Sequence, residues 1–362
     1  MSPKVAIVHD YLTQTGGAER VVLYMARAFP GAPIYTSLYE PDRTFPGFRE
    51  LDVRPMEHLN RIGLLRRNQR IGLPLFGRAF RKLAIDADVV LCSSSGWAHQ
   101  VRSQGRKIVY CYAPARWIYE PPQLFSGTTR SYERLVRLGA PLLRRADQAG
   151  AAGAERYLTS SSLIQRRIRE VYGIESEILA PPPALPTAGP ESALDLAPGA
   201  LLMVTRLFAY KNAEVVVRSA LESGRRLWVV GEGPDRRRLE QLGGGRIEFL
   251  GQVPDDRLRW LYRNCSALVA AAYEDFGLTP LEANAFGRPV AALRWGGYLD
   301  TVVEGATGVF FDQPAVDSLA EALDRLDTTA WDHDTLAAHA ASFGEDRFIA
   351  RLRQLAGEPV SC

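Results

Sequence analysis

The chain has 362 residues, enough for two domains, and its 46% hydrophobic and 23% charged residues are typical of an ordinary globular protein. A net charge of +3 is too small for a general binder of nucleic acids or other polyanions. The four cysteines are widely spaced and the five histidines form no cluster, which argues against a disulfide framework and a zinc site and favours a reducing cytoplasm.

The first half alternates short apolar runs with helix-length amphipathic segments, which predicts an α/β fold with parallel sheets. Buried strands are expected at 5–8, 89–92 and 108–112. The apolar run at 5–8 is too short for a signal peptide, and no other run is long enough to cross a bilayer. The protein is therefore expected in the cytoplasm, with any membrane contact peripheral.

The segment 180–200 has an unusual composition, with prolines at 181, 182, 183, 186, 190 and 198. Such a segment cannot lie inside a sheet and is expected to be a linker. The α/β pattern then restarts, with strands expected at 201–204, 227–230, 247–250 and 290–293 and a helix at 213–223.

The pattern predicts two Rossmann-like domains that face each other across a cleft. Their expected bounds are 1–180 and 181–345, and residues 346–362 form a C-terminal helix and tail that packs back on the first domain. In open α/β sheets, ligands bind beyond the carboxyl ends of the strands. The informative side chains are therefore expected just after strands.

The stretch YEDFGLTPLEANAFGRPV places two glutamates around a predicted helix start. Thr279 is the expected N-cap, Pro280 the first helical residue, and Glu282 occupies the capping-box position three residues after Thr279. Glu274 precedes the cap, and nothing local requires an acid there. It is suited to accept hydrogen bonds from sugar hydroxyls.

Two loops after strands could bind an anion. Gly16 and Gly17 open the first helix, where main-chain amides can approach a ligand closely, although a plain glycine turn explains them equally well. Arg206 leaves the strand 201–204, and Lys211 precedes Asn212, an expected N-cap. A cation near a helix N-terminus is repelled by the positive end of the helix dipole, and an anion bound between the two cations and the helix amides would offset that repulsion. The alternative is that both are solvated surface cations.

The segments YEDFGLTPLEANAFGRPV, GGYLDTVVEGATGVFF, TRLFAYKN, VVGEGPDRRRLE and IVHDYLTQTGGAERVV together resemble family 4 of the retaining GT-B glycosyltransferases, over nearly the whole chain. The segment PIYTSLY and the segment around Pro114 and Arg116 are similar to those of bacterial mannosyltransferases of surface-polysaccharide assembly that use GDP-mannose.

The resemblance implies specific roles. Glu274 would hold the donor sugar, Glu282 the nucleotide ribose, and Arg206 and Lys211 the diphosphate, whose charge they would neutralise as the leaving group departs. The resemblance also implies that further residues contact the donor: main-chain amides of Phe276, Gly277 and Leu278, the glycines Gly16 and Gly17 from the other domain, Arg116, and Val253 near the base.

One residue departs from the family pattern. Where the family carries a histidine that touches the donor sugar, this chain reads YCYAPAR and has Tyr112. A tyrosine hydroxyl is protonated near neutral pH. Either Tyr112 orients the sugar, or the donor is not a mannose donor, or Tyr112 is a core tyrosine at a strand end.

The resemblance implies front-face transfer with retention, in which the departing phosphate oxygen takes the acceptor proton and no metal or other cofactor is needed. The sequence Asp86-Ala-Asp88 precedes a strand rather than following it, so we interpret it as strand-entry polarity.

Residues 61–82 contain no acid but are rich in arginine, with one lysine, Lys82, and interleaved apolar residues. Such a segment is predicted to dock on an anionic membrane beside a polyprenyl-diphosphate-linked acceptor, although a solvated helical face or a site for a phosphorylated acceptor explains it as well.

The resemblance thus implies a retaining, metal-independent hexosyltransferase of polysaccharide or glycolipid biosynthesis that uses a nucleotide-diphosphate sugar, with GDP-mannose as the first choice. The alternatives are a UDP-sugar-dependent enzyme of the same fold and a non-catalytic, membrane-associated nucleotide-sugar-binding protein. A nucleotide-sugar epimerase is disfavoured, because it would need an acid/base pair beyond the residues already assigned and the sequence offers no good candidates. A nicotinamide-dependent dehydrogenase is disfavoured because GxGxxG is lacking after the first strand.

Overall fold

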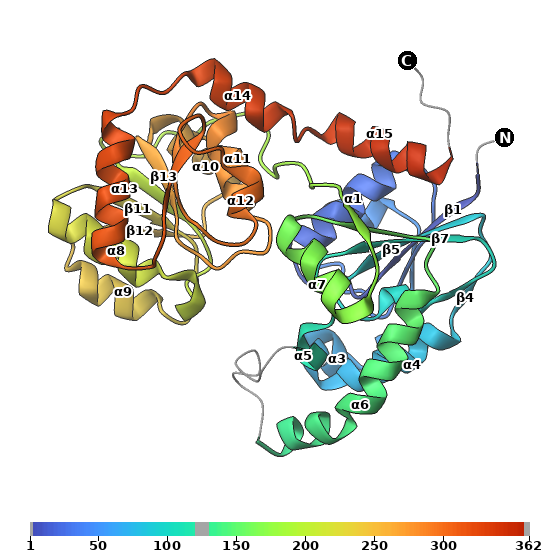
Figure 1. The fold of residues 1–362 in the computed structure, drawn as a ribbon. Helices are drawn as coiled ribbons and strands as arrows, with labels where there is room; N and C mark the ends of the chain where they lie inside the picture. Colours follow the sequence, from blue (N-terminus) through green and yellow to red (C-terminus); the bar gives the residue numbers. More distant parts are fainter. Residues whose placement is uncertain (1–2, 120–129, 358–362) are drawn as a thin grey trace. The chain divides into compact units, whose positions relative to one another are not determined.

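The computed structural model describes residues 3–119 and 130–357, which divide into two compact α/β units (Figure 1). Unit 1 consists of residues 1–181 together with 345–362, and unit 2 of residues 182–344. Each unit is built on its own parallel sheet, so the predicted fold class is confirmed.

Unit 1 contains a seven-stranded parallel sheet in the order β3-β2-β1-β5-β7-β8-β9. The strands are β1 Val5–His9, β2 Ile34–Thr36, β3 Val53–Pro55, β5 Val89–Ser94, β7 Arg106–Cys111, β8 Arg156–Thr159 and β9 Ser176–Ile178. Two short strands, β4 Ala84–Ile85 and β6 Arg102–Ser103, pair separately. All five residues of β1 are buried, as the unbroken apolar run predicts for a strand covered on both faces.

The main helices of unit 1 are α1 Gly17–Ala28, α4 Leu73–Lys82, α6 Arg130–Ala152, α7 Ser162–Tyr172 and α15 Glu345–Ala356. Shorter helices are α2 Glu57–Asn60, α3 Gly63–Arg67 and α5 Arg116–Tyr119. The C-terminal helix α15 lies alongside α1 (Figure 1). Its apolar stripe enters the same core as β1 and β5 through Phe348, Leu352 and Leu355, which confirms that the last helix packs on the first unit.

Unit 2 contains a six-stranded parallel sheet in the order β12-β11-β10-β13-β14-β15. The strands are β10 Leu201–Val204, β11 Leu227–Val230, β12 Glu248–Gly251, β13 Ala267–Ala270, β14 Val290–Leu293 and β15 Gly308–Phe311. The helices are α8 Ala213–Ser223, α9 Arg236–Gly243, α10 Asp255–Asn264, α11 Leu278–Ala285, α12 Tyr298–Thr301, α13 Val316–Thr328 and α14 His333–Ala341.

The proline-rich segment contains no strand, as predicted, but it is not a free linker. From residue 182 onward it belongs to unit 2, where Leu185 is buried in the core. The buried Arg259 of α10 donates from Nε to the Pro186 carbonyl (3.0 Å) and from Nη1 to the Pro190 carbonyl (3.0 Å). These bonds fasten the segment, because proline carbonyls remain acceptors even though prolines donate nothing.

We predict that Phe348→Ala lowers the free energy of unfolding of unit 1 by about 3–5 kcal/mol, the usual cost of truncating a buried phenylalanine. The ring is 1% exposed and packs edge-on against Tyr24 and Tyr110. Urea unfolding measures the change, with Asp346→Ala on the exposed side of the same helix as control. Equal effects of the two variants would contradict the docking of α15.

Candidate functional site

The loop after β10 carries the two predicted cations of unit 2. Lys211 is 4% exposed, and its ammonium forms an ion pair with the Glu274 carboxylate. Arg206, at the other end of the loop, is exposed. Asn212 occupies the N-cap position of α8 as predicted, but its backbone is left-handed (φ 54°) and its side chain does not cap the helix. Its Nδ2 donates instead to the Ala271 carbonyl (2.8 Å), which fastens this loop to the end of β13.

Arg206 and Lys211 both contact an aromatic residue that the sequence analysis did not select. Arg206 Nη2 lies 3.2 Å from the Tyr210 hydroxyl, and the Lys211 ammonium lies 4.9 Å from the centre of the Tyr210 ring. The guanidinium also lies over Phe208, 5.6 Å from the ring centre. The sequence feature that could have identified this residue is the pair of aromatic residues between two cations in RLFAYK.

Glu274 lies on the loop after β13, with its side chain 34% exposed. Its carbonyl accepts a hydrogen bond from the Gly297 amide (3.0 Å), so the loop after β14 supports the loop after β13. A Cβ on Gly297 would lie 2.1 Å from the Phe276 Cα. Glycine is therefore required at 297 for the two loops to touch, and the contact fixes the backbone on which Glu274 stands.

The start of α11 differs from the prediction. The N-cap is Gly277 (φ 86°), not Thr279, so Thr279 and Pro280 both lie within the first turn and Glu282 is not part of a capping box. A left-handed backbone suits glycine, and a Cβ at this position would lie 2.5 Å from the Tyr298 ring. The helix therefore begins earlier, at Leu278, because Gly277 both makes the turn and leaves room for Tyr298.

Glu282 is held inside unit 2, 6% exposed, by its neighbours rather than by its own helix. Oε2 accepts from the Tyr262 hydroxyl (2.8 Å), and Oε1 accepts from the Ala184 amide (3.3 Å) of the proline-rich segment. Burial raises the pKa of Tyr262 well above its usual value, and the Glu282 charge raises it further, so this hydroxyl remains a donor.

The other predicted residues of unit 2 lie at the same carboxyl edge of its sheet. Phe276 is buried, Leu278 is the first residue of α11, and Val253 follows β12 and packs against the core. Burial, followed by the Glu274 charge, raises the pKa of Tyr298 well above its usual value. Unit 2 thus gathers Arg206, Lys211 and Glu274 at one place.

In unit 1, the predicted glycine turn opens α1. Gly16 is the N-cap and Gly17 the first residue of the helix. A Cβ on Gly17 would meet nothing within 4 Å, whereas a Cβ on Gly16 would lie 2.7 Å from Glu19 Oε2. Space beside Gly17 is what a close approach of ligand requires, whereas a side chain at position 16 would displace the end of the Glu19 side chain. The predicted residue Arg116 begins α5 and is half-buried.

Tyr112 follows β7, and its hydroxyl belongs to a hydrogen-bonded chain inside unit 1. It donates to the Ala18 carbonyl (3.1 Å), directly after the glycine turn, and lies 2.9 Å from Ser93 Oγ, which in turn lies 2.9 Å from His9 Nδ1. Because a carbonyl can only accept, the single Tyr112 proton is committed to Ala18. Burial raises the pKa of Tyr112 well above its usual value, and Tyr110 raises it further.

His9 and Glu19 were missed by the sequence analysis, although both are polar residues in an apolar context. They are 2% and 1% exposed, and His9 Nε2 lies 3.8 Å from Glu19 Oε1. Glu19 Oε1 also accepts from Gln14 Nε2 (3.0 Å). This buried polar group connects the end of β1 to the first turn of α1 and places Tyr112 in a structural network.

Metal-binding clusters of three or more His, Cys, Asp or Glu side chains are absent from residues 3–119 and 130–357. Asp86 pairs with the Lys4 ammonium (3.1 Å), and Asp88 accepts from the Lys4 amide (2.8 Å), both before β5. Their contacts are those of residues at the entry of a strand.

Comparison with known proteins finds one family model that covers the loops of unit 2. Residues 190–334 match the model of the family described as "Glycosyl transferases group 1". This range spans nearly all of unit 2, including Arg206, Lys211, Glu274 and Glu282. Unit 2 is therefore similar to a group 1 glycosyltransferase domain.

Curated relatives match part of the chain. An alpha-1,3/1,6-mannosyltransferase, ALG2, of Dictyostelium discoideum is 39% identical over 82 residues, 22% of this chain and 19% of that protein. A D-inositol 3-phosphate glycosyltransferase of Nocardia farcinica is 32% identical over 229 residues, 53% of this chain and 50% of that protein. The chain therefore spans half or less of the length of these relatives.

Solved structures match the whole chain at low identity. A sucrose-phosphate synthase from Thermosynechococcus elongatus gives a TM-score of 0.72 at 18% identity and covers 97% of this chain and 98% of its own. Anabaena HepE in complex with UDP-glucose gives 0.71 at 14% identity and covers 98% and 99%. The chain has the GT-B fold.

We predict that Tyr112→Phe lowers the free energy of unfolding by about 1 kcal/mol at neutral pH, because it breaks the bonds to Ala18 and Ser93. It should also flatten the loss of stability at alkaline pH. Since the folded pKa of Tyr112 is raised, the unfolded hydroxyl ionises first above about pH 10, and stability falls by up to about 1.4 kcal/mol per pH unit until the folded group also titrates.

Urea unfolding between pH 7 and 11 measures both effects, with the exposed Tyr273→Phe as control. Identical alkaline slopes for Tyr112→Phe and the wild type would show that the Tyr112 hydroxyl is not buried in the folded protein.

Proposed function

We propose that the chain is a retaining glycosyltransferase that transfers a hexose from a nucleotide-diphosphate sugar to a glycan or lipid-linked acceptor. The observation that carries this proposal is the buried Lys211 ammonium paired with Glu274 at the carboxyl edge of the unit 2 sheet, with Arg206 on the same loop. Two cations and one carboxylate are the groups needed to hold a diphosphate next to a sugar rich in hydroxyls.

The proposed chemistry follows from these groups. Arg206 and Lys211 bind the diphosphate and stabilise the charge that develops as the bond to the anomeric carbon breaks. Glu274 accepts hydrogen bonds from sugar hydroxyls and orients that carbon, while Glu282 holds the ribose. The departing phosphate oxygen takes the acceptor proton, so attack occurs on the same face and the configuration is retained. No protein base and no metal ion takes part in this proposal.

The nature of the donor is part of the proposal. GDP-mannose is the first choice, and the name of the Dictyostelium relative, a mannosyltransferase, supports mannose as the sugar. A UDP-sugar remains the second candidate, supported by the UDP-glucose complex of the Anabaena structure. The Tyr112 proton is committed to Ala18, so Tyr112 does not donate a hydrogen bond to the sugar and does not favour mannose over another hexose. Thermal-shift screening with GDP-, UDP-, ADP- and dTDP-sugars decides it, since a ligand of the folded state raises the melting temperature.

We predict that Lys211→Ala and Glu274→Ala each lower kcat by about 100- to 1,000-fold, the usual cost of removing a group that stabilises transition-state charge. Steady-state transfer with the donor found in the screen measures the loss. A matched control is the exposed pair of Arg294 with Glu304 (2.8 Å) in the same unit, where Glu304→Ala should leave kcat unchanged. Full turnover by Glu274→Ala would refute its assigned role.

We also propose that unit 1 docks on an anionic membrane. Among the described residues no helix has both the length and the apolar character to cross a bilayer. The described cysteines Cys92, Cys111 and Cys265 are free and buried, which suits the reducing cytoplasmic side of a membrane.

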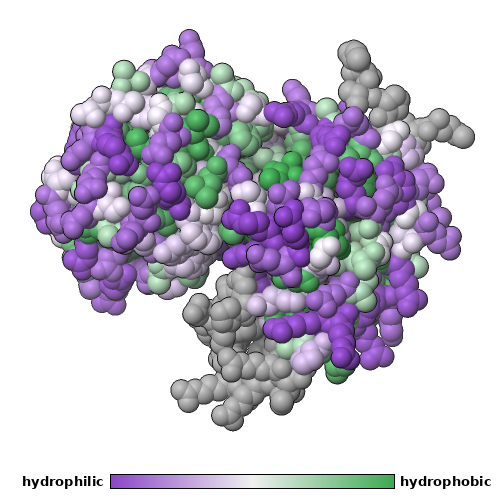
Figure 2. All heavy atoms as spheres, viewed as in Figure 1, coloured by the Kyte–Doolittle hydropathy of each residue, from purple (hydrophilic) through white to green (hydrophobic). Residues whose placement is uncertain are grey.

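On the face drawn in Figure 2, hydrophilic side chains cover most of the surface, with small hydrophobic areas between them.

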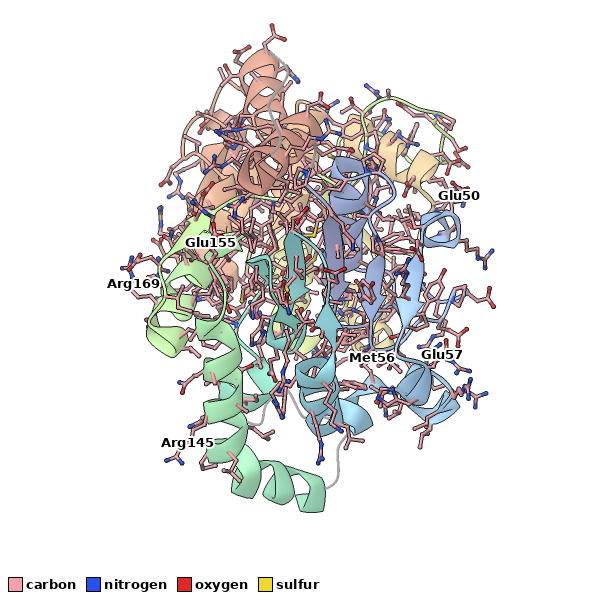
Figure 3. All side chains as sticks on the ribbon, turned by 90° about the vertical axis from the view of Figure 1, so that its right-hand side faces the viewer. Glu50, Met56, Glu57, Arg145, Glu155 and Arg169 are labelled. Carbon is pink, nitrogen blue, oxygen red and sulfur yellow. The ribbon has the colours of Figure 1, made fainter. Side chains whose placement is uncertain are left out.

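The proposed docking surface is formed by α3, α4 and α6, which lie at the same end of unit 1 in both ribbon views (Figures 1 and 3). Leu64, Leu75 and Leu142 are 61%, 56% and 72% exposed, whereas Leu65 and Phe76 of the same segment are core residues. Arg145 projects outward from α6 (Figure 3). The exposed leucines and cations of this surface are the combination that binds anionic lipid.

Some cations of the predicted segment are engaged within the protein. Arg66 pairs with Glu40 (2.9 Å), and Arg81 donates to Gln100 (2.6 Å). Arg67, Arg78 and Lys82 are exposed and have no ion-pair partner among the described residues. The docking charge is therefore smaller than the count of cations in the sequence indicates.

We predict that replacing Arg67, Arg78 and Lys82 together by glutamine weakens binding to phosphatidylserine-rich vesicles by about 100-fold, since each cation near such a surface contributes about 1 kcal/mol. Co-sedimentation measures the change, and the same triple replacement of exposed Arg237, Arg246 and Arg257 in unit 2 is the control. Unchanged sedimentation of the first variant would refute the docking surface.

A further inference from the structure

Tyr210 is a large aromatic residue that contributes little to the core of unit 2. It is 45% exposed and lies in the short 3-10 turn Ala209–Lys211, between the two cations of the candidate site. Singly exposed aromatics are common on protein surfaces, so the exposure itself indicates nothing. The contacts of the residue are more informative.

Three parts of Tyr210 touch three parts of the candidate site. Its hydroxyl accepts a hydrogen bond from Arg206 Nη2 (3.2 Å), and its ring faces the Lys211 ammonium at 4.9 Å. Its carbonyl accepts from the amide of Tyr273 (3.4 Å), which precedes Glu274. One residue therefore contacts both cations directly and the carboxylate-bearing loop through the main chain.

The type of partner matters for Arg206, because Lys211 already has a carboxylate partner in Glu274. Among the described residues Arg206 has no carboxylate partner, and the contacts of its guanidinium are with Tyr210 and Phe208. A carboxylate would hold the guanidinium firmly but would cancel the charge that attracts a diphosphate. A tyrosine supplies an acceptor oxygen and a ring face that attracts cations while leaving the net positive charge in place.

Arginine and lysine side chains also lose considerable rotamer freedom when they are fixed in one place. A neutral residue that restricts both before the ligand arrives reduces the entropy lost on binding. From these contacts we infer that Tyr210 is a positioning residue of the diphosphate site, which holds Arg206 through its hydroxyl and Lys211 through its ring. The inference rests on the function proposed above.

The experiment compares Tyr210→Phe, which removes only the hydroxyl, with Tyr210→Leu, which also removes the ring. The probe is whichever of GDP, UDP, ADP and dTDP binds the wild type most tightly, and calorimetry measures its dissociation constant. We expect Tyr210→Phe to weaken binding by about 3- to 10-fold, the usual effect of one hydrogen bond. Tyr210→Leu should weaken it by a further factor of about 2 to 5, from the lost contact with the ammonium.

A change in fold is distinguished from a change in positioning by two controls. Tyr273→Phe removes the hydroxyl of a neighbouring exposed tyrosine whose ring packs on Trp295, and it should leave binding and melting temperature unchanged. In an Arg206→Ala background, Tyr210→Phe should have no additional effect on binding, because the hydroxyl acts through Arg206. A merely structural role of Tyr210 would give the same additional effect with or without Arg206.

The outcomes separate this inference from the proposed function. If Arg206→Ala weakens binding and Tyr210→Phe does not, or if their effects simply add, the positioning role is wrong while the diphosphate site stands. If no nucleoside diphosphate binds the wild type, or if Arg206→Ala binds as tightly as the wild type, the diphosphate site itself is wrong and the inference falls with it.

Discussion

The candidate site depends on the pairing of the buried Lys211 ammonium with the Glu274 carboxylate. An ammonium that is withdrawn from water loses several kcal/mol of solvation unless an opposite charge compensates it. Hydrogen bonds around the site hold the two loops that carry Lys211 and Glu274. The Asn212 amide fastens the lysine loop to β13, and Gly297 supports the backbone of Glu274. Both loops are thus fixed independently of the ion pair, so the pair can be opened without unfolding the loops.

This arrangement provides a physical account of donor binding. In the absence of donor, Glu274 serves as the counter-ion of Lys211. In the proposed function, a diphosphate that contacts Lys211 and Arg206 would supply the negative charge instead and would release the carboxylate to accept hydrogen bonds from the sugar. The exchange would replace one ion pair by another. Lys211 is already desolvated in the folded protein, so binding of the ligand would not have to supply that free energy. Tyr210 fits this account because a neutral residue can hold the cations in both states.

The sequence predicted the parts of the structure that depend on local pattern. The strands 201–204, 227–230 and 290–293 and the helix 213–223 have the predicted bounds, because unbroken apolar runs and a closing glycine mark them clearly. The short strands β2, β3 and β9 escaped prediction, since three residues carry too little periodicity. The helix start at Gly277 was misplaced because Thr279-Pro280 is a good local cap, and only the packing of Tyr298 in space favours the earlier start.

The candidate site was likewise predicted only where the local sequence pattern marks its residues. Arg206, Lys211 and Glu274 were selected from the sequence because they follow strands, and unit 2 brings them together. Tyr210, His9 and Glu19 were missed because their significance lies in contacts that the order of residues does not reveal. Tyr112 was left with three interpretations, and its bond to Ala18 favours the structural one.

The most direct test of the central claim is a crystal structure of the protein with a non-hydrolysable analogue of the donor. The account predicts a phosphate oxygen within about 3 Å of Lys211 Nζ and another within the same distance of the Arg206 guanidinium, with the Glu274 carboxylate moved onto a sugar hydroxyl. Phosphates bound elsewhere, with the pair of Lys211 and Glu274 still closed, would contradict it.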